Sequence, residues 1–298
     1  MTLPLTETAN PRTADLDLLP TEELVRRIND EDATVAGAVR ACCAEIACAI
    51  DRIAVCLRRG GRMIYVGAGT SGRIGVLDAA ECLPTFGMPP ERVFGIIAGG
   101  SGALLKAVEN AEDDAVAGAR AMDDALIDGD DAVIGLSASG GAPYVIAALR
   151  RARERGALIT VAVSCVPNAP LSATAEIAIE TVTGPEVLTG STRLKAGTAQ
   201  KMVCNLLSTG AMVKIGKTYG NKMVDVQATN AKLVLRSRRL LREVGGVTDD
   251  TEAARLLAAA GGGVKRAIVM ARRGVDAGEA ARLLAAAGDR LGAALGEA

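Results

Sequence analysis

Two short segments rich in glycine and hydroxyl side chains could bind an anion. They are GAGTSG at 67–72 and SASGG at 137–141. Glycine lets the backbone approach an anion closely, while hydroxyls and backbone N–H groups at a helix N-terminus bind phosphate. Tight turns without a ligand are the alternative interpretation, but the two segments together favour a phosphate site. Its candidate residues are Gly69, Thr70, Ser71, Ser137, Ser139 and Gly140.

Acid–base chemistry would fall to carboxylates, because the chain contains no histidine. Glu81 lies near the predicted end of a helix among Ala, Cys and Leu, where burial and the helix dipole would raise its pKa and suit a general acid. Pro84 should end that helix. Glu109 and Glu112 are three residues apart and would share one face of the next helix. A solvated surface charge is the alternative for each glutamate.

A third polar segment, GPEVLTGSTRLKAGTAQK at 184–201, surrounds another predicted helix start. Glu186, Ser191 and Lys195 are its candidate substrate-binding residues. A helix cap without a ligand is the alternative, but it would need fewer polar groups than this segment carries. No metal site is expected, because histidine is absent and the seven cysteines include no CxxC pair.

The elements that must position these residues alternate along the chain. Apolar runs that end in Gly or Ser alternate with helical stretches, which is typical of a doubly wound parallel α/β sheet. GxGxxG at 67–72 raises the alternative of a dinucleotide site, but the expected acidic residue is missing where the second strand ends in Ala-Gly-Gly. Strands are expected within 62–69, 93–100, 132–139, 158–165 and 175–182, and helices at 71–83, 103–125, 143–155 and 194–215.

Helical segments flank this sheet region. Apolar residues at helical spacing predict helix over 21–58, with Thr21 as a possible N-cap. In the tail, EAARLLAAAG occurs at 252–261 and again at 279–288, on either side of VKRAIVMARRG. We expect an N-terminal helical segment (1–55), the α/β domain (56–220), a connecting helix (221–240) and a small helical domain (241–298).

Composition excludes several classes of partner. The net charge is −1, with 34 basic and 35 acidic residues, and there is no Trp, so neither a nucleic acid nor an anionic membrane is an expected partner. The N-terminus lacks the basic and apolar regions of a signal peptide. Together with the odd number of cysteines, this predicts a cytoplasmic protein with reduced thiols.

The ordered motifs VGAGTSGR, LDAAEC, IAGG, VENAED, SASG, EVLTGSTRLKAGTAQK and GNKMVDV resemble the N-acetylmuramic acid 6-phosphate etherases, which have a sugar isomerase (SIS) domain. The likeness runs from Thr6 to about Asn230 and includes TETAN at 6–10. It implies a homodimeric, cofactor-free lyase that releases D-lactate and N-acetylglucosamine 6-phosphate in cell-wall sugar recycling. It also places the family's two catalytic glutamates on Glu81, as acid, and Glu112, as base.

One departure from the family pattern lies beside the predicted phosphate loop. The family usually has SASGRTPYV, whereas Gly141 and Ala142 stand here in place of the arginine and the threonine. Either another cation compensates for the arginine, or substrate affinity is weakened, and a family member that has lost its usual substrate stays an alternative. Two alternative functions also stay open. One is a non-catalytic regulatory protein that senses a sugar phosphate, and the other is an aldose–ketose isomerase that uses Glu186.

Overall fold

The computed structural model describes residues 3–226 and 231–297. It divides into two compact units, which are described separately. The first contains Met1–Ala80 and Glu91–Thr209, and the second contains Glu81–Pro90 and Gly210–Ala298. The N-terminal helices therefore belong to the same unit as the sheet.

The first unit is built on a five-stranded parallel sheet. The strand order is β2-β1-β3-β4-β5, and every neighbouring pair is parallel. The three central strands are buried along their whole length, as their unbroken apolar sequences predict. All five expected strands are confirmed, at β1 (Met63–Gly67), β2 (Val93–Ile97), β3 (Ala132–Leu136), β4 (Ile159–Ser164) and β5 (Ile177–Glu180).

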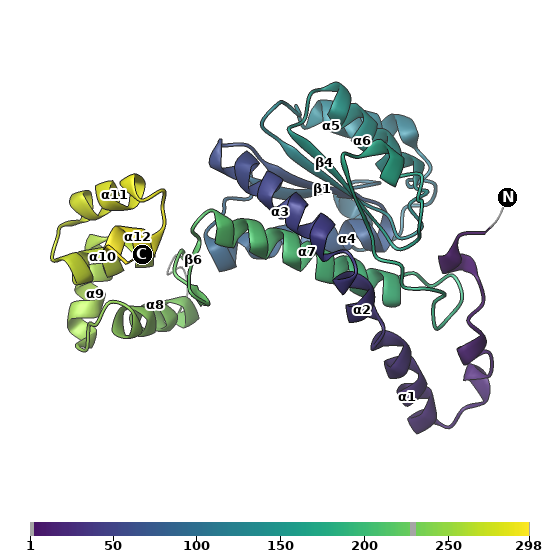
Figure 1. The fold of residues 1–298 in the computed structure, drawn as a ribbon, viewed down its shortest axis with the longest axis horizontal. Helices are drawn as coiled ribbons and strands as arrows, with labels where there is room; N and C mark the ends of the chain where they lie inside the picture. Colours follow the sequence, from purple (N-terminus) through teal and green to yellow (C-terminus); the bar gives the residue numbers. More distant parts are fainter. Residues whose placement is uncertain (1–2, 227–230, 298) are drawn as a thin grey trace. The chain divides into compact units, whose positions relative to one another are not determined.

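Helices cover both faces of this sheet (Figure 1). On one face, Ile64, Val66 and Val133 pack in a cluster with buried residues of α5 and α6. On the other face, the hydroxyl of Tyr65 donates to Asp78 on α4 (2.8 Å) and to the backbone oxygen of Cys204 on α7 (3.4 Å). The helices of this layer arrangement are α3 (Cys43–Arg58), α4 (Gly69–Phe86), α5 (Ala115–Asp124), α6 (Pro143–Glu154) and α7 (Lys195–Lys214).

The strand order places the two Gly/Ser segments side by side. After β1 the chain adds β2 on one side of it and later β3 on the other, so the order of successive strands reverses between β1 and β3. Ligands of open parallel sheets bind beyond the carboxyl ends of strands at such a point. Gly67 at the end of β1 is paired with Leu136 at the end of β3, so the segments that follow them start next to each other.

The N-terminal region is less regular than a helix over 21–58. Three helices are found instead of one, and Thr21 is the first helical residue rather than the N-cap, which is Pro20. A series of 3-10 turns precedes them: η1 (Leu5–Glu7), η2 (Pro11–Thr13) and η3 (Leu16–Leu18). The helices are α1 (Thr21–Asp32), α2 (Val35–Arg40) and α3.

Two further expectations about helices were wrong. Residues 103–125 are helical only in η4 (Ser101–Leu104) and α5, because Asn110 has a left-handed conformation (φ 61°) that interrupts any helix between them. Pro84 does not end its helix: α4 continues to Phe86, and Gly87 ends it with φ 63° and an N–H that donates to Leu83 (2.9 Å).

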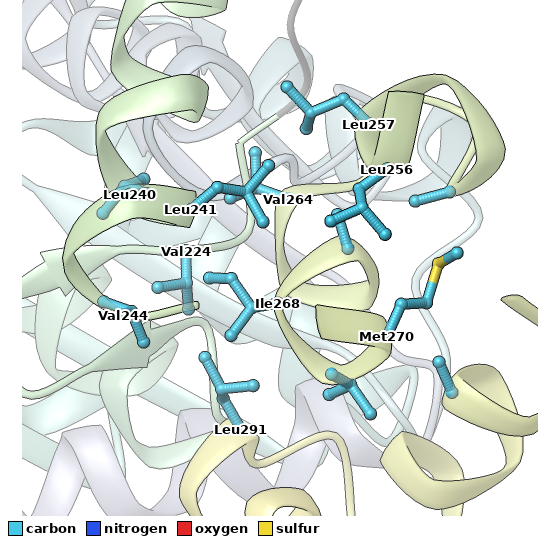
Figure 2. Packing of buried hydrophobic residues seen from close by; sticks show 14 of the residues in the cluster. Val224, Leu240, Leu241, Val244, Leu256, Leu257, Val264, Ile268, Met270 and Leu291 are labelled. Atoms are coloured by element: carbon cyan, nitrogen blue, oxygen red, sulfur yellow. The ribbon is translucent and has the colours of Figure 1, made fainter. Parts of the chain in front are cut away.

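The second unit has its own apolar core (Figure 2). Val224, Leu241 and Ile268 lie at its centre, each with no exposed surface. Both copies of the repeat form helices, capped by Asp249 and Asp276. Within the expected connecting helix (221–240), residues 222–223 instead form a short strand that pairs with 218–219. The helix is described from Ala231 onward, and 227–230 lie outside the described residues. The elements are β6 (Thr218–Tyr219), β7 (Lys222–Met223), α8 (Ala231–Glu243), α9 (Asp250–Ala259), α10 (Val264–Arg273), α11 (Ala277–Ala286) and α12 (Leu291–Leu295).

Among the described residues, no single helix is both long and apolar enough to cross a membrane. Only the bent pair formed by Thr21–Arg40 and Cys43–Arg58 meets the length and composition of a span, and only when its two parts are joined.

Candidate active site

A cavity of about 200 Å³ opens where the segments after β1 and β3 meet. The first segment turns sharply into α4: a Cβ on Gly67 would lie 2.7 Å from the nitrogen of Gly72, so only glycine fits. This turn points the first N–H groups of α4, which have no partner inside the helix, toward the strand ends. The lining residues are Glu7, Ala68, Gly69, Thr70, Ser71, Glu112, Leu136, Ser137, Ala138, Ser139, Ala142 and Thr192.

Five hydroxyl side chains line this cavity and suit a phosphate group. Four of them, Thr70, Ser71, Ser137 and Ser139, were predicted from the sequence. Ser71 is buried, and its hydroxyl donates to the side-chain oxygen of Gln200 on α7 (2.8 Å). None of the described lining residues is Lys or Arg. A bound phosphate would therefore depend on hydroxyls and the N-terminus of α4.

The missing arginine of the family pattern bears directly on this charge balance. Ala142 lines the cavity, and Gly141 is exposed at its edge, where an added Cβ would meet only the Ser139 hydroxyl at 3.6 Å. The backbone N–H of Gly141 instead donates to that hydroxyl (3.2 Å). No cation among the described lining residues replaces the arginine.

Glu112 supplies a carboxyl to the cavity. It lies in the irregular segment between η4 and α5, not on a shared helix face with Glu109, which is exposed and lines a different hollow. The backbone oxygen of Glu112 accepts a hydrogen bond from the N–H of Tyr144 on α6 (3.0 Å), which fixes the segment. Although much of the residue is exposed, partial desolvation of its carboxyl, and secondarily the charge of Asp113, raise the pKa of Glu112. A raised pKa brings a carboxylate closer to the strength useful in a general base.

Glu81 lies on α4 but is not among the residues that line the cavity. Its side chain is exposed, which corrects the expectation that Ala, Cys and Leu neighbours would bury it. The helix turns Cys82 inward and leaves Glu81 on the outer side, so neighbours in sequence do not surround it in space.

Four other predicted binding residues are not among those that line the cavity. Glu186 has no exposed surface, and its two oxygens accept the backbone N–H groups of Lys195 and Ala196 (both 2.9 Å), so it caps α7. Lys195 is also fully buried, with its ammonium 2.7 Å from Glu31. Ser191 is half-buried outside the cavity. Gly140 forms the turn after β3, with φ 65° and its N–H bonded to the oxygen of Ser137 (3.1 Å).

Two polar residues of the lining, Glu7 and Thr192, were not among the candidate site residues predicted from the sequence. Thr192 follows Ser191 in the polar segment at 184–201, and Glu7 belongs to TETAN, a motif to which no role had been given. A larger hollow of about 760 Å³ lies between the N-terminal turns and residues 187–189, but of its described lining residues only Asp17 is titratable. The smaller cavity is therefore the candidate site. The described residues contain no cluster of three or more metal-ligating side chains.

Comparison with known proteins agrees with this architecture. Residues 45–153 match the family model for the N-terminal SIS domain of glucokinase regulatory protein, and residues 111–210 match the SIS domain model. The fold is thus that of an α/β protein of the SIS class, with the candidate site at the ends of the first and third strands. The phosphoheptose isomerase of Neisseria gonorrhoeae is similar at 17% identity over 64% of this chain and 98% of that one, with a TM-score of 0.49.

Two relatives are much more similar. The N-acetylmuramic acid 6-phosphate etherases of Salmonella schwarzengrund and Salmonella typhimurium are each 57% identical over 273 residues, which is 92% of this chain and 91% of theirs. The chain belongs to the N-acetylmuramic acid 6-phosphate etherase family.

Proposed function

We propose that this protein cleaves the lactyl ether of N-acetylmuramic acid 6-phosphate to give N-acetylglucosamine 6-phosphate and D-lactate. The observation that carries the proposal is a single cavity that combines the hydroxyls of both Gly/Ser segments with the carboxyl of Glu112. We further propose that the protein works as a cytoplasmic homodimer without a cofactor, as the family resemblance implies.

The reaction needs one base, one acid and water. In the open-chain sugar the aldehyde acidifies the proton on C2, and we assign Glu112 as the base that removes it. The electron pair left on C2 forms a C2–C3 double bond, and the C3–O bond breaks with its pair going to the lactate oxygen. Glu81 is the proposed donor of the proton that this oxygen takes up. Water then adds across the double bond.

The direct test is incubation with N-acetylmuramic acid 6-phosphate and an assay for D-lactate and N-acetylglucosamine 6-phosphate. We expect both products in equal amounts from the unmodified protein. The Glu112→Gln variant is the control for lactate of any other origin. Saturable binding of the substrate without release of lactate would instead indicate a sugar-phosphate-sensing regulator. The match of residues 45–153 to a domain of glucokinase regulatory protein is the reason to test this alternative. The isomerase alternative depended on Glu186, whose two oxygens are both occupied in capping α7.

Phosphate binding by the hydroxyls predicts a specific kinetic change. Ser137→Ala should raise KM about tenfold and change kcat less, because a hydrogen bond to the phosphate is made equally in ground and transition states. Ser71→Ala should behave in the same way. Thr198→Ala removes an exposed α7 hydroxyl whose partner is the backbone oxygen of Leu194, and serves as the matched control. An unchanged KM in both serine variants would refute this assignment.

A further inference from the structure

The cavity contains a second carboxylate, Glu7, that the proposed reaction does not use. It ends η1, in an N-terminal arm (residues 5–18) that lies outside both matched SIS segments, 45–153 and 111–210. The SIS fold alone therefore does not supply this side chain. The arm adds it to the cavity.

The arm is attached firmly to the rest of the first unit. Thr6, immediately before Glu7, has no exposed surface. Asn10 donates to Glu31 (2.9 Å), and the guanidinium of Arg12 pairs with the same carboxylate. The hydroxyl of Thr13 donates to the backbone oxygen of Val187 (2.8 Å). These contacts fix the backbone on both sides of Glu7, and this limits the positions that its carboxylate can take.

The carboxylate itself lies close to the loop that leads to Thr192. A Cβ on Gly190 would be 2.9 Å from Oε2 of Glu7, so the carboxylate lies beside this glycine. Glu7 is thereby placed at the wall where Thr192 also contributes its hydroxyl to the cavity. An ionised carboxylate can only accept hydrogen bonds.

The sign of its charge limits what Glu7 can recognise. A carboxylate repels the phosphate of a sugar phosphate, and no Lys or Arg among the described lining residues offsets that repulsion. Glu7 therefore favours binding only if the ligand presents N–H or O–H donors to it. An N-acetylated amino sugar carries both, on its acetamido group and its ring hydroxyls. Inorganic phosphate carries no sugar ring at all.

We infer that Glu7 is a specificity-determining residue that accepts hydrogen bonds from the sugar part of the ligand, while the hydroxyls of the two Gly/Ser segments hold its phosphate. This inference rests on the proposed function of the cavity. It divides the cavity into a phosphate end, at the start of α4, and a sugar end, at the arm.

Calorimetric titration with two probes separates these ends. The probes are N-acetylglucosamine 6-phosphate and inorganic phosphate, each titrated into the full-length protein and its variants. Glu7→Ala should weaken binding of the sugar phosphate about tenfold, as expected for the loss of hydrogen bonds to a charged acceptor. Its affinity for inorganic phosphate should be unchanged or slightly higher. Glu7→Gln should be intermediate with the sugar phosphate, since its amide retains one acceptor oxygen.

Two further variants make the outcome decisive. Glu22→Ala removes an exposed carboxylate of α1 and should leave both affinities unchanged. Ser71→Ala should weaken both probes. If Glu7 acted only through its negative charge, Glu7→Ala would raise the affinity for both probes. That result, or an unchanged affinity for the sugar phosphate, would overturn the inference. If the unmodified protein binds neither probe, the proposed function of the cavity fails, and the inference fails with it.

Discussion

Glu112→Gln is expected to lower the rate of C2 proton exchange and the rate of lactate release, each by about 10²–10⁴-fold. This is the usual contribution of a general base. The glutamine retains the shape of the side chain but cannot take up the proton. The measurement is incubation in deuterated water, with deuterium at C2 followed by NMR and lactate followed by enzymatic assay. Because burial and Asp113 raise the pKa of Glu112, activity should fall as pH drops through that raised value. Asp113→Asn should move this fall to lower pH.

Glu81→Gln distinguishes the acid from the base. Without its acid, the protein should still exchange the C2 proton and should release lactate very slowly. The opposite pattern, with exchange lost in Glu81→Gln and retained in Glu112→Gln, would reverse the two roles. Glu81 is exposed and does not line the cavity that contains Glu112. Mixing Glu81→Gln with Glu112→Gln therefore tests whether the two glutamates act within one copy of the chain or across two. Recovered lactate release would mean that the glutamates act across two copies of the chain, and no recovery would place them in one.

Glu31→Gln is expected to lower the free energy of unfolding of the first unit by about 3–5 kcal/mol. The carboxylate of Glu31 is the partner of Lys195, whose side chain has no exposed surface, and the variant leaves that charge buried without a countercharge. Urea unfolding followed by tyrosine fluorescence would report it, because Tyr65 and Tyr144 lie in this unit. Glu22→Gln, in the exposed pair with Arg26, should cost under about 1 kcal/mol. Equal effects of both variants would contradict the assigned role.

The same side chain gives stability a defined pH dependence. Hydrogen bonds from Arg12 are the main cause that lowers the pKa of Glu31 to about 2, and Lys195 and Asn10 add to them against the opposing effect of burial. In the unfolded chain the carboxyl has an ordinary pKa near 4.5, so it takes up its proton first as pH falls. The contribution of Glu31 is therefore complete above about pH 4.5 and is lost between there and about pH 2. The stability difference between the protein and Glu31→Gln should shrink over this range.

The five parallel strands and the two Gly/Ser segments that follow β1 and β3 could be predicted from sequence because both depend on local signals. Unbroken apolar runs identify buried strands, and Gly with Ser or Thr after a strand identifies a turn into a helix. The family resemblance likewise needs only ordered motifs, and the 57% identity to the Salmonella etherases confirms it.

Sequence by itself could not assign the environment of single side chains. Glu81 was expected to be buried from its neighbours along the chain, but a helix turns adjacent residues in different directions, and Glu81 is exposed. The helix expected to carry Glu109 and Glu112 does not form, because contacts such as the Tyr144–Glu112 backbone hydrogen bond hold that segment in an irregular conformation.

Tertiary structure alone decided which polar residues share the cavity. The pairing of Gly67 with Leu136 brings together segments about 70 residues apart, and register of this kind depends on packing of the whole sheet. Lys195 is removed from the site by Glu31, 164 residues earlier in the chain, while Glu7 is brought to it by an arm anchored at that same glutamate. Local periodicity contains no information about contacts at such separations, since they form only when the free energy of burial and pairing across the folded unit exceeds the entropy lost in closing the chain.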